Sequence, residues 1–471
     1  MVGIKSYGVH VPFFRLSAAE IRRAWGKPPA EGERSVAYYN EDSITMAVNA
    51  ANHCLQGIDR HKVDGLYFAS TTSPYQEKLS AATVAMASDL RRNIFTADFT
   101  NSLRSGTMAL RAAIDAVNGG SASNVLLVAA DCRMGTPGSE FEQIFGDGAA
   151  ALLIGNSDII ASIEGCYTHF EEMFDIWRVP GDKFVRFWDT LFTYGEGYLK
   201  SLEEGLRGIL DQHGLKTDNI DKFAFYAPDI RRHRAMAKAL GLDYKRRVQD
   251  PLFDRVGNTG SAFALMTLIG ALEDVSEGNS ILLGNFGDGV DAFLLKVTSQ
   301  IAKTRERKGM TYHLKKKSLL TSYERYLRIR DLIPFASGRK AAAGLPLPEI
   351  WRERSQAISF HGGKCKSCGT IQYPIQRVCA QCQTKDNYEE VRLSDKKGTI
   401  FAHTTDHLAS TVDPPLSRAL VDLEDGGRGH FVVTDVGDRE LAIGMPVEMT
   451  FRNQDTVDGV NRYMWICRPM R

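Results

Sequence analysis

Four cysteines in the last quarter of the chain have the spacing of a metal site. Cys365 and Cys368 are separated by two residues, as are Cys379 and Cys382, and ten residues lie between the two pairs. Such pairs bring four thiolates around a tetrahedral Zn²⁺ with no vacancy for a substrate, which predicts structural zinc. Iron in the same four-sulfur geometry is the main alternative. Because the surrounding segment is too small to bury its own core, the metal is expected to supply folding free energy rather than catalysis.

The other four cysteines, Cys54, Cys132, Cys166 and Cys467, are scattered, which favours reduced thiols over a disulfide framework. The first residues alternate like a strand and lack the apolar stretch of a signal peptide, and no run of 18 apolar residues occurs. We therefore expect a soluble, cytoplasmic protein that does not bind membranes. With 58 basic and 57 acidic residues there is no global field for nucleic acid either, so any anion site must be local.

Residues 1–298 read as a layered α/β unit that positions any site in this part of the chain. Apolar runs of strand length alternate with alanine-rich helices, and the pattern runs twice, around 1–160 and 165–298. The strands are expected at 65–70, 125–130, 149–155, 222–227, 280–283 and 290–297, and the helices at 80–91, 106–117, 201–215 and 260–273.

Three further units are expected after residue 298. Residues 299–360 form a basic, partly helical connector, with 14 basic and five acidic residues between 301 and 360. It is either docked on the first unit or a source of charges for the phosphates of a nucleotide-bearing ligand. Residues 361–390 form the zinc ribbon. Residues 391–471 contain five regularly spaced short strands, which suits a small β-barrel of the OB type.

The ribbon and barrel resemble the small acyl-CoA-associated OB-fold proteins that accompany thiolase-like enzymes. Some OB barrels bind single-stranded nucleic acid through aromatic side chains and basic grooves. Here the charges of 391–471 are roughly balanced, and no aromatic cluster is interleaved with lysines. We therefore do not expect nucleic acid as a partner.

The first 298 residues resemble the thiolase superfamily, specifically bacterial and archaeal 3-hydroxy-3-methylglutaryl-CoA synthase. The matching stretches are DFTNSLRSGTMAL (98–110), AADCRMGTPGSEFEQIFGDGAAALLIG (129–155), DIWRVPGDKFVRFW (175–188), FAFYAPDIRRHRAMAKALGL (223–242), VGNTGSAFAL (256–265) and GNFGDGVDAFLLKV (284–297). The resemblance implies a duplicated five-layered α-β-α-β-α fold, commonly a homodimer, and coenzyme A as part of the substrate.

The resemblance also shows a missing nucleophile. The family's catalytic cysteine lies five residues after the strand aspartate and three before Gly-Thr, which in this sequence is Leu103, counted from Asp98 and from Gly106. Leucine cannot form a thioester. Ser102 is adjacent, but a serine would need a base to attack an acyl group.

Two more family groups are replaced. Tyr226 stands where the family has its histidine, and Thr71 where it has its general acid/base glutamate, while Asn258 of the Gly-Asn-Thr turn survives. Tyr226 is the candidate acid/base and Asn258 the candidate donor to a thioester oxygen, with Ser102 and Thr71 as weaker catalytic candidates. The alternatives are a packed tyrosine, a turn asparagine, and hydroxyls that cap strand ends.

Substrate-binding candidates come from the same stretches. Leu103 is expected to wall the vacated thiol position, and Gly287 and Gly289 to form a tight loop beside the substrate. Arg178, Lys183 and Arg186 are candidates for the coenzyme A phosphates, although such residues on loops are commonly just solvated. His233, within RRHR, is expected to be exposed.

Aldol chemistry on an acyl-CoA needs no nucleophile, only a stabilised thioester enolate and an acid/base group. The first hypothesis is therefore an acyl-CoA lyase or aldolase that cleaves or forms a β-hydroxyacyl-CoA with an aldehyde or ketone. A second keeps a synthase-like or acyltransfer condensation with Ser102 as nucleophile. A third is a non-catalytic subunit that binds acyl-CoA, with the ribbon and barrel as its docking surface.

Overall fold

The computed structural model describes residues 1–304, 306–334 and 347–470. Nine strands make its largest sheet assembly: β1 (Gly3–His10), β4 (Gly65–Ala69), β5 (Phe95–Phe99), β6 (Asn124–Asp131), β7 (Gly148–Gly155), β8 (Ala161–Phe170), β11 (Lys222–Phe225), β12 (Ser280–Phe286) and β13 (Gly289–Val297). Their hydrogen-bonded order is β11-β12-β13-β8-β1-β7-β6-β4-β5. All six strands predicted for this region are present, and their ends are displaced by at most three residues.

Helices cover and separate the two halves of this assembly. The helices of the first unit are α1 (Ala18–Ala24), α2 (Ser43–Cys54), α3 (Ser80–Ala87), α4 (Ser105–Asn118), α5 (Glu140–Ile144), α6 (Thr190–Phe192), α7 (Lys200–Gln212), α8 (Ile230–Ala239), α9 (Tyr244–Arg247) and α10 (Phe263–Asp274). Helix α3 ends four residues before its predicted end, where Asp89 takes a left-handed conformation (φ 55°).

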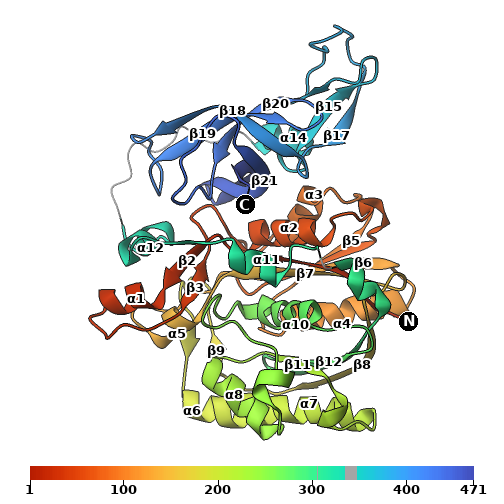
Figure 1. The fold of residues 1–471 in the computed structure, drawn as a ribbon, viewed down its shortest axis with the longest axis vertical. Coiled ribbons are helices and arrows are strands. Elements are labelled where there is room, and N and C mark those ends of the chain that lie inside the picture. The colour runs from red at the N-terminus through yellow and green to blue at the C-terminus, as the bar shows by residue number, and fades with distance from the viewer. Residues whose placement is uncertain (305, 335–346, 471) are drawn as a thin grey trace.

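The layers run α-β-α-β-α, as the family resemblance implied. Helix α10 contacts β1 and β7 on one side and β11 and β12 on the other, and every residue from Phe263 to Leu272 is buried. Such an apolar helix needs protein on all sides, which the position between two sheets provides. Figure 1 shows α2 and α3 above the upper sheet and α7 and α8 below the lower one.

The two halves meet at a short strand contact. β1 pairs with β8 only through Gly3 with Ser162 and Ile4 with Ala161. A Cβ on Gly3 would lie 2.3 Å from the carbonyl oxygen of Ala161, so the approach requires glycine. Short elements complete the unit: β2 (Phe14–Ser17), β3 (Glu33–Val36), β9 (Ile176–Trp177), β10 (Arg186–Phe187), the 3-10 turns at Arg60–Lys62, Thr217–Asn219, Gly260–Ala262 and Ser299–Thr304, and a π-helical segment at Thr193–Leu199.

The basic connector docks on the first unit. It contains α11 (Met310–Lys315), β14 (Ser318–Leu319), α12 (Tyr323–Ile329), α13 (Leu347–Arg352) and α14 (Arg354–Ala357), while 335–346 lie outside the described residues. β14 pairs with β2, and α12 buries Tyr323, Tyr326 and Ile329. Arg325 and Arg328 pair with Asp413 of the barrel segment. The charges of Arg325 and Arg328 are thus paired within the protein and not left for the phosphates of a ligand.

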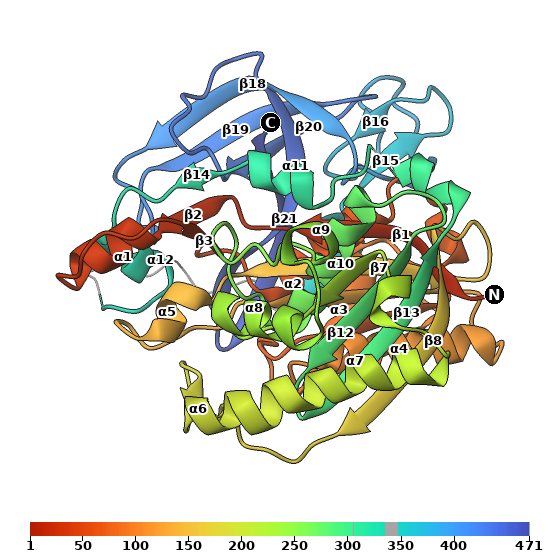
Figure 2. The same ribbon diagram turned by 60° about the horizontal axis from the view of Figure 1, so that its bottom comes forward.

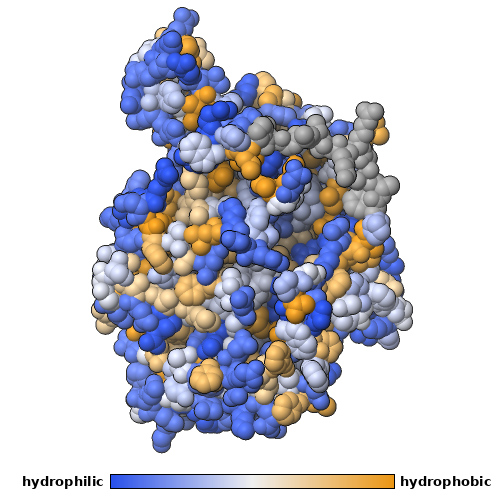
Figure 3. Space-filling model, turned by 180° about the vertical axis from the view of Figure 1, so that it is seen from behind, coloured by the Kyte–Doolittle hydropathy of each residue, from blue (hydrophilic) through white to orange (hydrophobic). Residues whose placement is uncertain are grey.

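The ribbon and barrel form the C-terminal part. The ribbon has β15 (His361–Cys365), β16 (Ile371–Gln372) and β17 (Tyr388–Arg392), and the barrel has β18 (Lys397–Asp406), β19 (Leu416–Leu423), β20 (Arg428–Val433), β21 (Pro446–Val457) and β22 (Val460–Pro469). The barrel closes in the order β18-β19-β20-β22-β21, which confirms the five-stranded barrel. Figures 2 and 3 show the ribbon projecting from the body beside the barrel. The exact division into 1–298, 299–360, 361–390 and 391–471 stays a prediction.

A buried ion-pair network joins the barrel to the first unit. The Arg452 side chain on β21 lies 3.0 Å from both Glu41, just before α2, and Asp435, after β20. Glu41 also contacts His10 Nε2 on β1 at 2.9 Å. Because these side chains are almost completely buried, the barrel is fixed on the first unit by groups that cannot be exposed cheaply.

Candidate functional site

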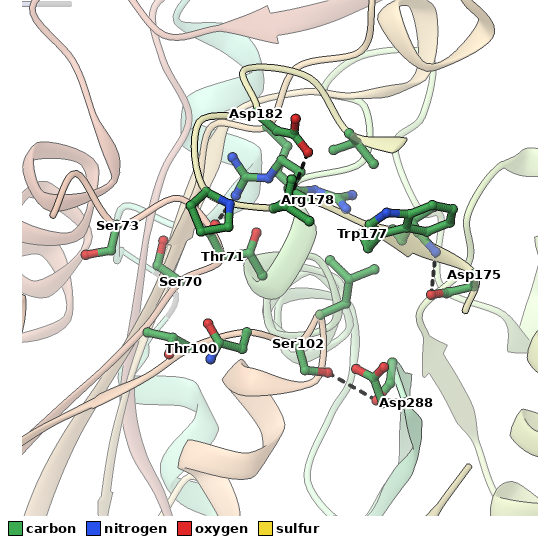
Figure 4. A pocket seen from close by; sticks show the side chains of 18 of the residues that line it. Ser70, Thr71, Ser73, Thr100, Ser102, Asp175, Trp177, Arg178, Asp182 and Asp288 are labelled. Atoms are coloured by element: carbon green, nitrogen blue, oxygen red, sulfur yellow. Dashed lines mark hydrogen bonds between the residues drawn. The ribbon is translucent and has the colours of Figure 1, made fainter. Parts of the chain in front are cut away.

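An open cleft of about 900 Å³ lies at the ends of the parallel strands β4, β5 and β6. Three segments form its walls: the loop after β4, the residues that lead into α4, and residues 171–185, which we call the strap. Carboxyl ends of parallel strands meet at one edge, which explains why distant segments converge here. Figure 4 shows Thr71, Ser102, Arg178 and Asp175 around this space. Leu103 and Gly287 line it as well.

Leu103 occupies the floor of the cleft, one residue before the N-cap of α4. It is 6% exposed, and its carbonyl oxygen accepts a 3.2 Å hydrogen bond from Asn285 Nδ2. A Cβ on Gly287 would lie 3.0 Å from the Leu103 Cβ, so the glycine allows the loop to pass close to the leucine. The position next to α4 is thus filled by hydrocarbon.

The Ser102 hydroxyl is hydrogen-bonded only to backbone groups in the described ranges. Its Oγ donates to the carbonyl oxygen of Gly287 at 3.2 Å and accepts from the backbone N–H of Arg104 at 3.2 Å. Within the described residues no histidine or carboxylate is hydrogen-bonded to this hydroxyl. An unactivated serine hydroxyl is a weak nucleophile.

Thr71 is held by a satisfied carboxylate. Its backbone N–H and its hydroxyl donate to Asp131 at 2.7 and 3.0 Å, and Asp131 also accepts from Ser70, Thr72 and the backbone of Ser261. Arg178, from the strap, donates to the Thr71 carbonyl oxygen. The Thr71 hydroxyl therefore supports the loop and has its proton committed to Asp131.

Tyr226 and Asn258 lie in a second, deeper pocket of about 20 Å³ that adjoins the cleft at Asp175 and Ile176. That volume holds one water molecule or one carbonyl oxygen. Tyr226 is 3% exposed, and Asn258 Nδ2 donates to the Ala227 carbonyl oxygen at 3.1 Å and to Tyr226 Oη at 3.4 Å. Burial raises the pKa of Tyr226, while nearby Arg133 opposes the shift, so the phenol keeps its proton at neutral pH.

Two polar residues at the junction of the pockets were missed by the sequence analysis. Arg133, after β6, lines the cleft, donates from Nη2 to Asn258 Oδ1 at 3.2 Å and stacks over Phe145 at 4.3 Å. Asp175 lines both pockets and accepts from the backbone N–H of Ile176 at 2.6 Å. Burial raises the pKa of Asp175 to about 6, and Asp288 adds to the shift. The signal available was that Arg133 follows the end of β6 by two residues and that Asp175 is the first residue of the matching stretch 175–188.

Four other residues singled out in the sequence lie outside the cleft lining. Lys183 pairs with Asp331, and Arg186 pairs with Asp182 at 2.7 Å. Gly289 has φ 118°, and a Cβ there would lie 2.3 Å from the His169 carbonyl oxygen, which is a backbone reason for glycine. His233 was expected to be exposed, and that was wrong: it is fully buried and stacks on Phe225 at 4.4 Å.

The four ribbon cysteines converge as predicted. Their sulfur atoms all lie within 4.8 Å of one another, with 3.6 Å between Cys365 and Cys382 and 3.5 Å between Cys368 and Cys379. Thiolates around zinc lie about 2.3 Å from the metal, so sulfurs at the corners of a tetrahedron have separations of this order. The donor set and its geometry fit a zinc ion held by four thiolates.

Comparison with known families matches separate parts of the chain. Residues 359–388 match the ChsH2 rubredoxin-like zinc ribbon domain, residues 390–452 the ChsH2 C-terminal OB-fold domain, and residues 210–297 the C-terminal part of 3-oxoacyl-[acyl-carrier-protein] synthase III. The hydroxymethylglutaryl-CoA synthase of Methanopyrus kandleri is 30% identical over 345 residues, which cover 71% of this chain and 98% of that protein. The chain belongs to the hydroxymethylglutaryl-CoA synthase family. The synthase of Pyrococcus furiosus is likewise 30% identical, over 348 residues that cover 72% of this chain and 95% of that protein.

Solved structures place this hydroxymethylglutaryl-CoA synthase family member in the thiolase fold. MvaS in complex with 3-hydroxy-3-methylglutaryl coenzyme A aligns with a TM-score of 0.64 at 21% identity, covering 73% of this chain and 94% of MvaS. The curacin-pathway HMG synthase in complex with an acetyl donor carrier protein aligns with a TM-score of 0.64 at 19% identity, covering 83% and 99%. Thiolase-type unit, zinc ribbon and OB barrel are thus combined in one chain. None of the helices in the described ranges is long and apolar enough to cross a membrane.

Proposed function

We propose that the chain is an acyl-CoA aldolase or lyase that makes or breaks a β-hydroxyacyl-CoA through a thioester enolate. The observation that carries this proposal is Leu103, which fills the position before α4 and removes covalent catalysis through cysteine. In the cleavage direction the β-hydroxyl loses its proton, and the bond between the α and β carbons breaks. The electron pair passes into the enolate, which is protonated to an acyl-CoA, and an aldehyde or ketone leaves. Nothing else is consumed.

The junction of the two pockets offers the groups this chemistry needs. Asp175 faces both pockets and is ionised above about pH 6, so it is suited to take a proton from the α carbon. Tyr226 keeps its O–H and is suited to donate to the oxygen of the carbonyl partner, whose oxygen fits the deep pocket. Asn258, hydrogen-bonded to both Arg133 and Tyr226, would hold an oxyanion if its amide reorients from the Ala227 carbonyl.

Acyl-CoA as the substrate is supported by the family and by neighbours that hold coenzyme A or one of its esters. Structures with the same fold were solved with 3-hydroxy-3-methylglutaryl coenzyme A and with CoA. The cleft of about 900 Å³ has room for the end of such a ligand. Arg178, which lines the cleft, stays a candidate for binding the coenzyme A phosphates. Lys183 and Arg186 do not line the cleft and are paired with Asp331 and Asp182, so they could contact only a part of the ligand that extends beyond it.

A condensing reaction of the synthase type is the second candidate, favoured by family membership. It would require an acyl group on Ser102, whose hydroxyl lacks a hydrogen-bonded base. A trapped ester on Ser102 after incubation with acetyl-CoA, found by peptide mass spectrometry, would support the condensation and overturn the aldolase.

A homodimer is proposed on the ground of an unpaired edge. β5 ends the nine-stranded order, and Phe95 at its start is 65% exposed. An edge strand with an exposed aromatic residue is suited to pair with a second copy. Light scattering would show twice the chain mass of 52.2 kDa, and the chain mass alone would contradict the dimer.

The first experiment is to incubate acetyl-CoA and propionyl-CoA with the protein in D2O and follow their mass. Deuterium uptake at the α carbon is expected, because enolate formation does not need the unknown carbonyl partner. In Tyr226→Phe the uptake should persist, because the phenol acts on the partner's oxygen and not on the α carbon. With a β-hydroxyacyl-CoA as the substrate, carbon–carbon cleavage by this variant should fall by about 100-fold or more. Tight binding of the esters with no uptake would favour a non-catalytic acyl-CoA-binding subunit.

A further inference from the structure

Arg133 is a buried positive charge at the wall of the cleft. It is 4% exposed and lines the cleft, yet it forms no salt bridge with any residue in the described ranges. Its Nε has no hydrogen-bond partner there. The buried guanidinium groups of Arg330 and Arg452 are paired with carboxylates at 2.8 and 3.0 Å. That of Arg34 also has no salt bridge in the described ranges, but Arg34 does not line this cleft. A buried charge without a partner is costly, which indicates that a ligand supplies the missing anion.

The surroundings orient Arg133 without pairing it with a carboxylate in the described ranges. The ring of Phe145 lies 4.3 Å from the guanidinium carbon, and Asn258 Oδ1 accepts from Nη2 at 3.2 Å. Both contacts fix the plane of the guanidinium group. Asp175 is a neighbouring acid whose raised pKa the Arg133 charge partly lowers, but it makes no ion pair with Arg133 within 4 Å, and its own carboxylate accepts from the Ile176 backbone. The charge is therefore left for a group that enters through the cleft.

We propose that Arg133 binds a carboxylate of the carbonyl partner, so that this partner is a 2-oxo acid. The matching β-hydroxyacyl-CoA then carries a carboxylate on its β carbon. The inference rests on the proposed aldol function and specifies its substrate class. A guanidinium group takes a carboxylate through two parallel hydrogen bonds, which gives both strength and orientation.

The position of Asn258 explains why the carboxylate would sit next to the reacting carbonyl. Its amide joins the two groups: Oδ1 accepts from Arg133 and Nδ2 donates to Tyr226 Oη at 3.4 Å. The carbonyl oxygen and the carboxylate of a 2-oxo acid are on adjacent carbons. One molecule can therefore present its carbonyl oxygen to Tyr226 in the deep pocket and its carboxylate to Arg133 in the cleft.

Two esters that differ only at the β carbon test the inference. They are 3-carboxy-3-hydroxybutyryl-CoA, which would cleave to acetyl-CoA and pyruvate, and 3-hydroxy-3-methylbutyryl-CoA, which would cleave to acetyl-CoA and acetone. Calorimetry gives the dissociation constants of both esters for four proteins: the wild type, Arg133→Met, Arg133→Lys and the exposed control Arg111→Met. The melting temperature of each variant shows whether it is folded. The liberated acetyl-CoA gives the cleavage rate.

The wild type should bind the carboxylate ester at least about tenfold tighter than the methyl ester, as for a charge-assisted hydrogen bond. Arg133→Met should abolish this preference, Arg133→Lys should keep part of it, and Arg111→Met should leave it unchanged. Equal binding of the two esters by the wild type, or a preference that survives in folded Arg133→Met, would overturn the inference. If the wild type prefers the carboxylate ester in binding but cleaves neither ester, the aldolase proposal is wrong and the carboxylate site stands. If it cleaves both esters at equal rates, the aldolase proposal stands and the carboxylate site is wrong.

Discussion

The backbone N–H of Asn461, on the C-terminal barrel, donates a 2.9 Å hydrogen bond to the hydroxyl oxygen of Tyr75, which lines the cleft. The hairpin of β21 and β22 therefore reaches the cleft of its own chain. A second contact supports the same arrangement, because the Tyr463 hydroxyl donates to Asp42 at 2.6 Å at the start of α2. The barrel thus contributes to the rim of the candidate site.

Replacing Tyr75 by phenylalanine should weaken acyl-CoA binding more than turnover. The change removes the hydrogen bond to Asn461, worth about 1 kcal/mol, and loosens the rim without touching the reacting groups. We expect KM for acetyl-CoA in the deuterium-exchange assay to rise several-fold with kcat nearly unchanged. Tyr388→Phe, in the ribbon, is the matched control. A fall in kcat with constant KM would show that Tyr75 acts in the chemistry instead.

Asp175→Asn should strongly slow α-carbon exchange. The carboxylate must be ionised to accept a proton, and its pKa is raised to about 6 by burial, so the wild-type rate should rise with pH through about 6 and then level. The variant should lose about 100-fold in rate together with this limb of the profile. Asp211→Asn, on an exposed face, is the control.

Stability provides an independent check on the same residue. A carboxyl whose folded pKa is raised stabilises the fold at low pH and destabilises it once ionised, so Asp175→Asn should raise the melting temperature at pH 7.5. A lower melting temperature would contradict the burial of this charge.

The zinc ribbon should depend on its metal. One zinc per chain is expected from elemental analysis, and Cys379→Ser should lose it, because the four sulfurs lie within 4.8 Å of one another as one ligand set. Limited proteolysis should then cut between 361 and 390 while residues 1–298 stay intact. Cys166→Ser, outside the ribbon, should keep both metal and protease resistance. Full zinc content in Cys379→Ser would rule out the four-thiolate site.

Glu41→Gln should loosen the barrel from the first unit. Burial raises the pKa of Glu41, but Arg452 and His10 outweigh it and hold that pKa below the ordinary 4.5. The contribution of Glu41 to stability is therefore full above about pH 4.5 and is lost as the pH falls through the folded value. Breaking such a buried pair costs about 3 to 5 kcal/mol in unfolding free energy. Denaturant unfolding at pH 7, with exposed Glu204→Gln as control, measures it. A change below 1 kcal/mol at pH 7 would mean that Asp435 alone suffices for Arg452.

Much of the fold followed from pattern, because periodicity and spacing are local. The strands, the central helices, the cysteine ligand set and the barrel were all predictable. The strap was not, because local pattern does not show that Asp175 and Ile176 line both the open cleft and the pocket of Tyr226.

His233 shows the limit of composition. Its arginine neighbours favour exposure, but Met236 and Ala237, three and four residues further on, share its helix face and are buried. The imidazole therefore packs on Phe225. Arg133 was overlooked for the opposite reason, since nothing local marks one arginine as unpaired.

Because Asn461 and Tyr75 belong to the same chain, their contact does not depend on protein concentration. A barrel supplied by a separate protein would leave the rim whenever the concentration fell below its dissociation constant. Here the connector ties the barrel to the first unit, and a tether of this kind maintains an effective local concentration of about millimolar order. The complete rim is therefore present at a one-to-one ratio in every molecule, at any expression level and in any assay volume.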